Sequence, residues 1–221
     1  MAEQTTGGVK GATTVREPSP AQRTVARRTA EARATIPDLE LTREIEVTRA
    51  LDGPVSVDAM LMAACARALR AVPQANGAYR DGRFEAYSRI NIGFVVARGE
   101  TYVIPTVFDA DQRSPGELAE ELLALAQAAA ERTLLAPAFS GATFTLWNAG
   151  ALGVTRGGIV INPPQAGALA CGAVRDVPVL HDGHVVAGRV MAATLACDHR
   201  VLYGAVAADF LGAFERALID V

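Results

Sequence analysis

The sequence predicts an α+β fold, a two-layer sandwich in which helices flank a mixed or mostly antiparallel β-sheet. Two observations indicate it. Segments with helix caps lie among short β-rich runs, and the last third of the chain consists mainly of such runs, separated by turns rich in glycine or proline. Half of the 221 residues are hydrophobic and 20% are charged, which is a globular composition.

Residues 1–18 differ from the rest of the chain. They are rich in Gly, Thr and Glu and show no periodicity, so we expect a flexible leader. The remainder, 19–221, is long enough for one large domain with its own core. The sequence therefore predicts two parts, a leader and a single folded domain.

Four segments carry helix signals, such as a Ser at the N-cap, a Pro in the first turn or apolar residues at helical spacing. One of them also has capping-box spacing between Ser114 and Glu117. The predicted helices span about 20–34, 56–71, 114–132 and 204–219.

Seven segments read as strands, because β-branched or alternating apolar residues are bounded by turn residues. The run Arg98-Gly99-Glu100-Thr101 predicts a hairpin between two of them. The predicted strands span 39–47, 91–97, 102–107, 142–147, 158–162, 167–175 and 186–197.

Charge and composition argue against several classes of protein. A net charge of −3 gives no electrostatic footprint for nucleic acid. No apolar run reaches the roughly 18 residues of a membrane helix, and no secretory signal is visible. Three cysteines, Cys65, Cys171 and Cys197, form no CxxC pair and no metal-binding spacing, so we expect free thiols, a cytoplasmic protein and no metal.

The three histidines fall into two groups. His181 and His184 flank Asp182-Gly183, which reads as an exposed hairpin turn, and without a third ligand nearby they do not indicate a metal site. His199 ends a long apolar run just before the last predicted helix. A histidine where a buried strand meets a helix is well placed to face a cleft, although a structural role explains the position as well.

Two other segments are unusual. Residues 161–165, Ile-Asn-Pro-Pro-Gln, place two prolines between β-rich runs, which indicates a fixed turn or crossover. Residues 144–150 run from a strand into a glycine-containing loop and include Trp147, the only tryptophan. Core or interface packing is the simpler interpretation of Trp147.

Taken in order, these segments resemble the catalytic domain of the dihydrolipoamide acyltransferases, the E2 components of 2-oxo acid dehydrogenase complexes, which are related to chloramphenicol acetyltransferase. The C-terminal family motif Asp-His-Arg-x-x-Asp-Gly corresponds to residues 198–204. The resemblance covers about residues 18–219. The other matching segments are Arg27-Arg28 with 35–37, then 91–93, 144–150 and 161–165.

The resemblance implies a homotrimer with a site between neighbouring subunits, His199 coming from one and the region of Trp147 from the other. In this family the histidine is a general base that takes a proton from a thiol, and the thiolate attacks an acyl thioester. The acyl group would pass between a dihydrolipoyl thiol on a separate carrier domain and a phosphopantetheine thiol, that of coenzyme A or of an acyl carrier protein. A Ser or Thr hydroxyl stabilises the oxyanion, and such a donor contributes about 10²–10³ in rate.

The chain departs from this pattern at three positions. Trp147 replaces the Ser or Thr, Tyr203 replaces the Asp that follows the histidine, and Thr101 replaces a glycine of the substrate-channel loop. We take His199, Trp147 and Tyr203 as the catalytic candidates and expect Trp147 to narrow or reshape the acyl pocket. A specialised acyl group, as in secondary metabolism, follows from that change. The substrate-binding candidates are Asn148, Thr101, Tyr102, Asn91 and Arg28.

The resemblance also implies partners, namely a lipoyl-bearing carrier protein or domain and a thiamine-diphosphate-dependent E1-type enzyme. Lys10, the only lysine, lies in the leader and is not expected to carry lipoate. The chain ends at Val221 without the hydrophobic tail that joins trimers into larger particles, so we expect a trimer that assembles no further. Two alternatives stay open: a non-catalytic trimeric scaffold of the same family, and acetylation of a small hydroxyl compound as in chloramphenicol resistance.

Overall fold

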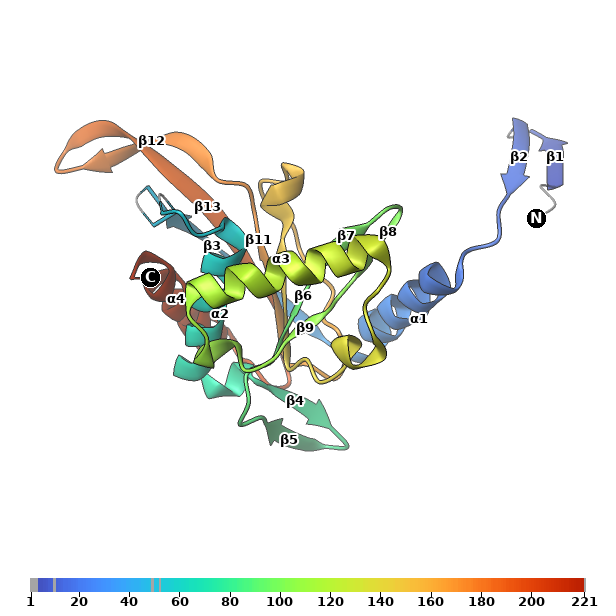
Figure 1. Ribbon diagram of the computed structural model, residues 1–221, viewed down its shortest axis with the longest axis horizontal. Helices are drawn as coiled ribbons and strands as arrows, with labels where there is room; N and C mark the ends of the chain where they lie inside the picture. Colours follow the sequence, from blue (N-terminus) through green and yellow to red (C-terminus); the bar gives the residue numbers. More distant parts are fainter. Residues whose placement is uncertain (1–3, 10, 49, 52, 221) are drawn as a thin grey trace.

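A seven-stranded mixed sheet lies at the centre of the computed structural model, which describes residues 4–9, 11–48, 50–51 and 53–220 (Figure 1). β10 runs parallel to both of its neighbours, whereas the other pairings are antiparallel. The strand order is β12 (Arg175–His181), β13 (His184–Asp198), β11 (Gly167–Cys171), β10 (Phe144–Asn148), β6 (Ile92–Phe94) and β9 (Thr106–Val107), and β3 (Asp38–Glu46) pairs with β13.

Helices form in all four predicted segments, and three of them begin at a predicted cap. Ser19 caps α1 and Ser114 caps α3, each with a complete capping box, and Ser56 caps α2. The helices are α1 (Pro20–Thr35), α2 (Val57–Ala71), α3 (Pro115–Glu131) and α4 (Gly204–Ile219). None of the helices in the described part of the chain is long and apolar enough to cross a membrane.

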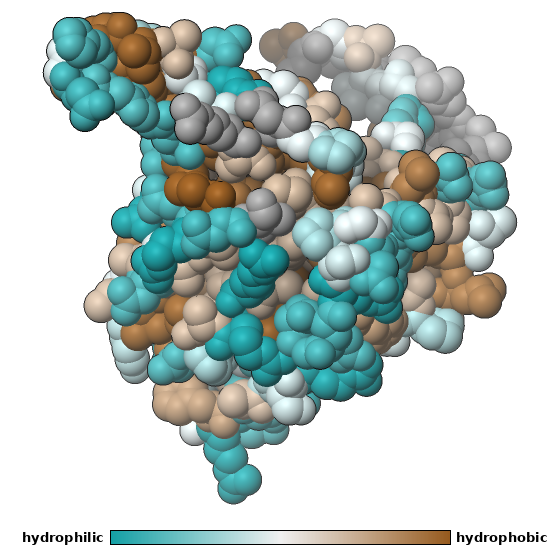
Figure 2. All heavy atoms as spheres, turned by 60° about the vertical axis from the view of Figure 1, so that its left-hand side comes forward, coloured by the Kyte–Doolittle hydropathy of each residue, from teal (hydrophilic) through white to brown (hydrophobic). Residues whose placement is uncertain are grey.

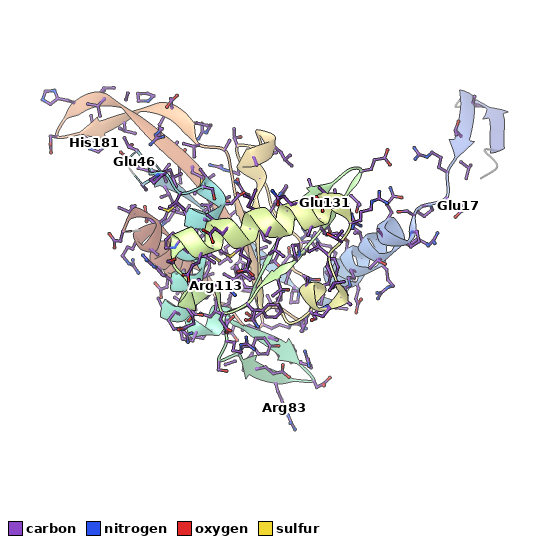
Figure 3. All side chains as sticks on the ribbon, in the orientation of Figure 1. Glu17, Glu46, Arg83, Arg113, Glu131 and His181 are labelled. Carbon is purple, nitrogen blue, oxygen red and sulfur yellow. The ribbon has the colours of Figure 1, made fainter. Side chains whose placement is uncertain are left out.

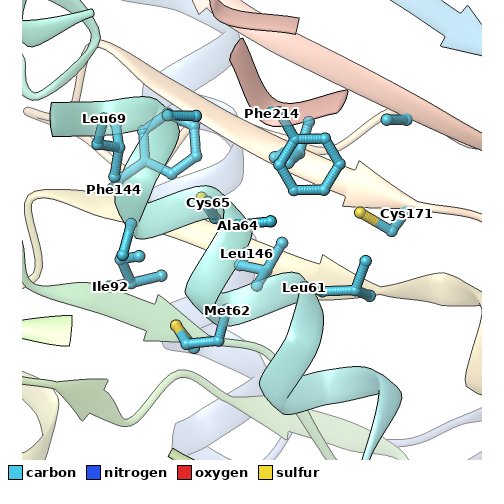
Figure 4. Packing of buried hydrophobic residues seen from close by; sticks show 14 of the residues in the cluster. Leu61, Met62, Ala64, Cys65, Leu69, Ile92, Phe144, Leu146, Cys171 and Phe214 are labelled. Carbon is cyan, nitrogen blue, oxygen red and sulfur yellow. The ribbon is translucent and has the colours of Figure 1, made fainter. Parts of the chain in front are cut away.

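The main core lies between α2 and the sheet. α2 packs against α3, α4 and β10, and ten of its residues are buried. Figure 4 shows Leu61, Cys65 and Leu69 of α2 facing Phe144 and Leu146 of the sheet. The helix is apolar on most sides because it is covered by the sheet on one side and by two helices on others. The predicted two-layer α+β class is thus confirmed.

Smaller elements complete the fold. Three two-stranded hairpins lie outside the main sheet: β1 (Gln4–Gly8) with β2 (Gly11–Val15), β4 (Gly77–Arg80) with β5 (Arg83–Ala86), and β7 (Val96–Arg98) with β8 (Thr101–Val103). The short 3₁₀ helices are η1 (Pro73–Ala75), η2 (Ala110–Gln112), η3 (Ala136–Phe139) and η4 (Ala149–Leu152).

The structure has two hairpins that the sequence analysis did not predict, and one predicted strand does not form. Residues 4–8 and 11–15 pair as a hairpin within the predicted flexible leader, on the far side of α1 from the sheet (Figure 1). The predicted strand over 158–162 has no strand partner, and it runs into the prolines Pro163 and Pro164, which cannot donate to a ladder. The hairpin of β4 and β5 was not predicted.

Residues 184–190, the first half of β13, pair with β12 in a two-stranded ribbon that projects from the rest of the molecule (Figure 1). Its tip carries exposed Leu180 and Val185, and apolar side chains are visible on the projecting part in Figure 2. His181 on this ribbon lies beside Glu46 of β3, with Nε2 at 3.0 Å from the carboxylate (Figure 3). As predicted, His181 and His184 flank an exposed turn at Asp182 and Gly183.

Candidate active site

His199 follows the last residue of β13 and is exposed, although every residue from Met191 to Asp198 is buried. Its backbone N–H donates to Pro37 O, at 2.9 Å, in the connection between α1 and β3. The turn after His199 is bonded to the end of β13, because the N–H groups of Val201 and Leu202 both donate to Asp198 O at 2.9 Å. The imidazole therefore stands at the surface on a backbone fixed from two sides.

Asp198 and Arg200, the neighbours of His199, are paired. The Asp198 side chain is 3% exposed, and its carboxylate accepts hydrogen bonds from the Arg200 N–H at 3.0 Å, from Nε at 2.9 Å and from Nη2 at 2.7 Å. These hydrogen bonds raise the pKa of Arg200 above its ordinary value. Sequence reasoning identified the motif but not this pair, which holds the turn that carries His199.

Tyr203 lies beside His199. It is the N-cap residue of α4, makes no capping hydrogen bond with its side chain and is 59% exposed. The two rings meet edge to face, with their centroids 5.8 Å apart. Two of the three catalytic candidates are thus in contact within one chain.

Trp147 lies on the other face of the sheet from α2. It is partly buried against a second apolar cluster, which includes Ile159 and Ile161 from the segment before the two prolines and Ala168 and Ala170 from β11. Because successive strand residues point to opposite faces, Leu146 enters the main core while Trp147 faces away from it. The indole thus packs as the simpler interpretation expected, yet part of it stays open.

The sheet register separates Trp147 from His199. Trp147 pairs with Ala170, and Ala170 pairs with Thr194, five residues before His199 along β13. At about 3.3 Å per residue and about 4.8 Å per strand, the two positions are separated by roughly 17 Å along the sheet and 10 Å across it. One chain does not bring these two candidates together.

Asn148 ends β10 and holds the following turn. Its side-chain oxygen accepts from Ala151 N–H at 3.3 Å, and its Nδ2 donates to Asp58 of α2 at 2.6 Å. Both ends of the amide are therefore used within the chain. The sequence could not predict this contact with Asp58, because nothing in the pattern of α2 shows that its first turn meets the end of β10.

Arg28 and Tyr102, two of the substrate-binding candidates, line the same cavity of about 320 Å³. It lies between α1 and the segments around β8 and β9, and Ile161 and Asn162 close one side. Thr101 instead lines a neighbouring hollow together with Arg16 and Arg132. The cavity combines apolar walls with a cation, a phenol and an amide, which suits an organic ligand with polar groups.

Asn91 lies in a different environment. It is 7% exposed, its Nδ2 donates to Gly141 O at 3.0 Å, and its Oδ1 accepts from Asp109 N–H at 3.0 Å. The side chain joins the start of β6 to two loops. Asn91 thus has a structural role in this chain, and its contact with substrate stays a prediction.

The segment 161–165 ends at Gln165, whose side chain bonds to β10 and to the loop just before it. Gln165 is buried, accepts from Thr145 Oγ1 at 2.6 Å and donates to Ala142 O at 3.2 Å. The peptide bond between Pro163 and Pro164 is cis. The segment predicted as a fixed turn or crossover thus leads into β11 and holds the start of β10 beside it.

The chain's own thiols are poorly suited to catalysis. Cys65, Cys171 and Cys197 are free and buried. Burial raises the pKa of Cys197 to about 11 and that of Cys171 further, so little thiolate forms near neutral pH. Among the described residues, no group of three or more His, Cys, Asp or Glu side chains could hold a metal ion. A nucleophilic thiol at this site would therefore belong to a substrate.

Comparisons with known proteins agree with this geometry. The family model of the 2-oxoacid dehydrogenases acyltransferase catalytic domain matches residues 10–221. The chain belongs to this family. The acetyltransferase component of the pyruvate dehydrogenase complex of Rickettsia bellii is 32% identical over 206 residues, which are 87% of this chain and 49% of the relative. The chain therefore spans about half the length of that family member.

Solved structures of E2 cores share the fold. A probable dihydrolipoamide acetyltransferase from Listeria monocytogenes aligns with a TM-score of 0.91 at 24% identity, over 93% of this chain and 94% of that one. The acetyltransferase of Azotobacter vinelandii aligns with a TM-score of 0.85 at 26% identity, over 93% and 92%. A chloramphenicol acetyltransferase aligns at 0.52 and 17% identity, over 88% and 92%, so the predicted family and fold are both confirmed.

The Azotobacter structure belongs to a study of the role of a serine, a histidine and an asparagine in the catalytic mechanism of that enzyme. In that enzyme the serine precedes the histidine by 52 positions and the asparagine follows it by four. Trp147, His199 and Tyr203 have the same spacing in this chain.

Proposed function

We propose that the chain is an acyltransferase that moves an acyl group between a dihydrolipoyl thiol and the phosphopantetheine thiol of coenzyme A or an acyl carrier protein, with His199 as general base. One observation carries the proposal most directly: an exposed imidazole stands on a turn that Pro37, Asp198 and Arg200 fix in place. A fixed and accessible base is what proton transfer from a bound thiol requires.

The reaction balances with the groups at hand. His199 takes the proton of the attacking thiol, and the thiolate adds to the thioester carbonyl. The tetrahedral intermediate collapses when its bond to the original sulfur breaks, and that sulfur takes the proton back from the imidazolium. No covalent intermediate with the protein is needed, which agrees with the buried state of all three cysteines.

The site is composite in this proposal. The register places Trp147 and His199 far apart within one chain. Both are nevertheless accessible, since His199 is exposed and Trp147 is partly exposed. A homotrimer in which the His199 turn of one subunit approaches the Trp147 and Arg28 side of the next would complete the site. A lipoyl carrier and an E1-type enzyme are the partners that this chemistry would need.

Trp147 sets the acyl group in this proposal. The indole N–H is a single donor on a large ring, whereas a serine hydroxyl is small and rotates freely. Packed against Ile159 and Ile161, the ring occupies space that a smaller side chain would leave to the acyl chain. We infer selection of a specialised acyl group, as in secondary metabolism.

Transfer assays with His199 variants test the proposed chemistry. The protein is incubated with dihydrolipoamide and a panel of acyl-coenzyme A thioesters, and His199→Ala is compared with His181→Ala and His184→Ala. We expect His199→Ala to lose at least 100-fold in kcat, within the usual range for a general base. The other two variants should retain full activity, because their side chains lie on the projecting ribbon. If no thioester gives transfer above the His199→Ala background, the scaffold alternative replaces this proposal.

The fluorescence of the single tryptophan tests the composite site. Protonated imidazole quenches indole emission only at close range, and Trp147 is the only tryptophan in the chain. We expect the emission of the assembled protein to change in His199→Ala and to stay unchanged in His184→Ala. An emission that is the same in wild type and in His199→Ala would contradict the inter-chain placement.

A further inference from the structure

We propose that Tyr79 and Arg200 are positioning residues for His199, so that the β4–β5 hairpin sets the place of the base. The proposal rests on the proposed function. It concerns an interaction that the sequence does not show, because Tyr79 precedes His199 by 120 positions.

The first link is a ring contact. The guanidinium carbon of Arg200 lies 4.5 Å from the centroid of the Tyr79 ring, which is a cation–π geometry. Tyr79 itself packs against Phe84 of β5, with the ring centroids 5.8 Å apart. The Tyr79 ring therefore lies against the Arg200 guanidinium. Phe84, which is 67% exposed, supports the Tyr79 ring from the other strand of the hairpin.

The second link is the ion pair described above. Arg200 holds a buried carboxylate with its backbone N–H and two side-chain nitrogens, and that carboxylate belongs to Asp198. The residues on both sides of His199 are thus joined to each other and to the hairpin. A lysine at position 200 would keep the positive charge. It could not donate from two nitrogens to Asp198 while a planar group lies over the Tyr79 ring.

The third link is a run of backbone hydrogen bonds. Ala166 N–H donates to Gly77 O of β4 at 2.8 Å, and Asp198 N–H donates to Ala166 O at 2.8 Å. Ala78 also forms a bridge with Gln165. The hairpin is therefore attached to the His199 turn through both side chains and main chain, and a displaced hairpin would displace the base.

Substitutions at Tyr79 separate these links. Tyr79→Leu removes the ring face, and Tyr79→Phe keeps it. We expect kcat for acyl transfer to fall about fivefold in Tyr79→Leu with KM unchanged, which corresponds to about 1 kcal/mol. Tyr79→Phe should stay within twofold of wild type. Arg83→Ala is the matched control on the same hairpin, because Arg83 points away into solvent (Figure 3), and it should change nothing.

A double-mutant cycle tests whether Tyr79 acts through Arg200. In an Arg200→Gln background, which lacks the cation, Tyr79→Leu should cause no further loss, because the contact that it removes is already gone. An equal fivefold loss in both backgrounds would contradict the proposal, as would a fivefold loss in Arg83→Ala.

The imidazole resonances provide a readout that does not depend on turnover. The chain has three histidines, so ring-labelled protein gives three signals, and His199→Ala identifies the one from the site. Tyr79→Leu should shift or broaden that signal and leave those of His181 and His184 unchanged, while Tyr79→Phe should leave all three in place. An unmoved His199 signal in Tyr79→Leu would overturn the positioning role. Absence of transfer in wild type would instead overturn the proposed function, whatever the spectra show.

Discussion

Adding one methyl group to Gly150 should destabilise the protein, and the surroundings of this glycine set the size of the effect. Gly150 is the second residue of η4, the 3₁₀ helix that follows Trp147 and Asn148. A Cβ there would lie 2.6 Å from Gly172 O, 2.7 Å from Ala173 Cα and 2.8 Å from Ala173 N. All three atoms are backbone, so relief requires η4 to move away from the segment after β11. Overpacking of this kind costs about 1–3 kcal/mol.

Gly157→Ala is the matched control in the same loop region. There the nearest atom to a new Cβ is Val154 Cγ1 at 3.6 Å, an ordinary contact. Both variants gain the same few tenths of a kcal/mol or more from a stiffer unfolded chain, so their difference isolates the clash. We expect Gly150→Ala to be about 2 kcal/mol less stable than Gly157→Ala, which for a chain of this size lowers the melting temperature by about 4–8 °C.

Urea unfolding and calorimetry at one protein concentration measure this difference, since an assembled protein unfolds in a concentration-dependent way. Equal stability of the two alanine variants, within about 0.5 kcal/mol, would show that η4 shifts freely and would refute the reasoning.

Other perturbations give separate tests. Trp147→Ser should speed acetyl transfer if the indole occupies the place of the family hydroxyl, and an unchanged or lower rate in the steady-state assay would count against that assignment. Ser114→Ala should lower the free energy of unfolding by about 1 kcal/mol in urea, because it removes one half of the capping box of α3. Hydrogen bonds from Arg89 lower the pKa of Asp109, so the stability from this pair is complete above the unfolded pKa and is lost as the pH falls through the folded one. Asp109→Asn should therefore show a smaller loss of stability between pH 5 and pH 3 (about the range of an ordinary Asp) than wild type in acid unfolding curves. Sedimentation should give a mass of about three chains, and a 24- or 60-chain particle would contradict the expected trimer.

Local signals predicted the helices well. Ser19 and Ser114 accept hydrogen bonds from the first turns that they open, as caps do, and such signals lie within four residues. The hairpin of β4 and β5 has an equally local signal. Asp81 and Gly82 form its turn with positive φ of 51° and 75°, the conformation that an Asp-Gly pair favours.

The predicted strand over 158–162 shows where local signals fail. Ile159 and Ile161 are buried and alternate like strand residues, but they pack against Ala168 and Ala170 on the face of the sheet. Alternation reports that one side of an extended segment is buried, and it does not report whether the backbone pairs. Only the tertiary structure decides between a strand within the sheet and an extended segment that covers it.

The contacts at the candidate site also divide into those between residues close in the sequence and those that only the tertiary structure brings together. His199 and Tyr203 are four residues apart, so their contact needs only the turn between β13 and α4. The contacts of Asn148 with Asp58 and of Arg200 with Tyr79 join segments far apart in the sequence, and no pattern in either partner announces them. The family motifs contain Asn148 and Arg200, whereas only the structure shows that Asp58 and Tyr79 are their partners.

The surroundings of His199 favour catalysis over a purely structural role. A histidine kept for packing would lie inside the protomer with both ring nitrogens satisfied, yet this one is exposed while the aspartate before it is buried. The side-chain ion pair and the cation–π contact of the turn belong to the neighbours of His199: Asp198 binds Arg200, and Arg200 stacks on Tyr79. A scaffold gains nothing from fixing an exposed ring so firmly, because a mobile turn would serve assembly equally well. The exposed imidazole is what the proposed inter-subunit site needs, because the register of β10, β11 and β13 keeps Trp147 of the same chain away from His199.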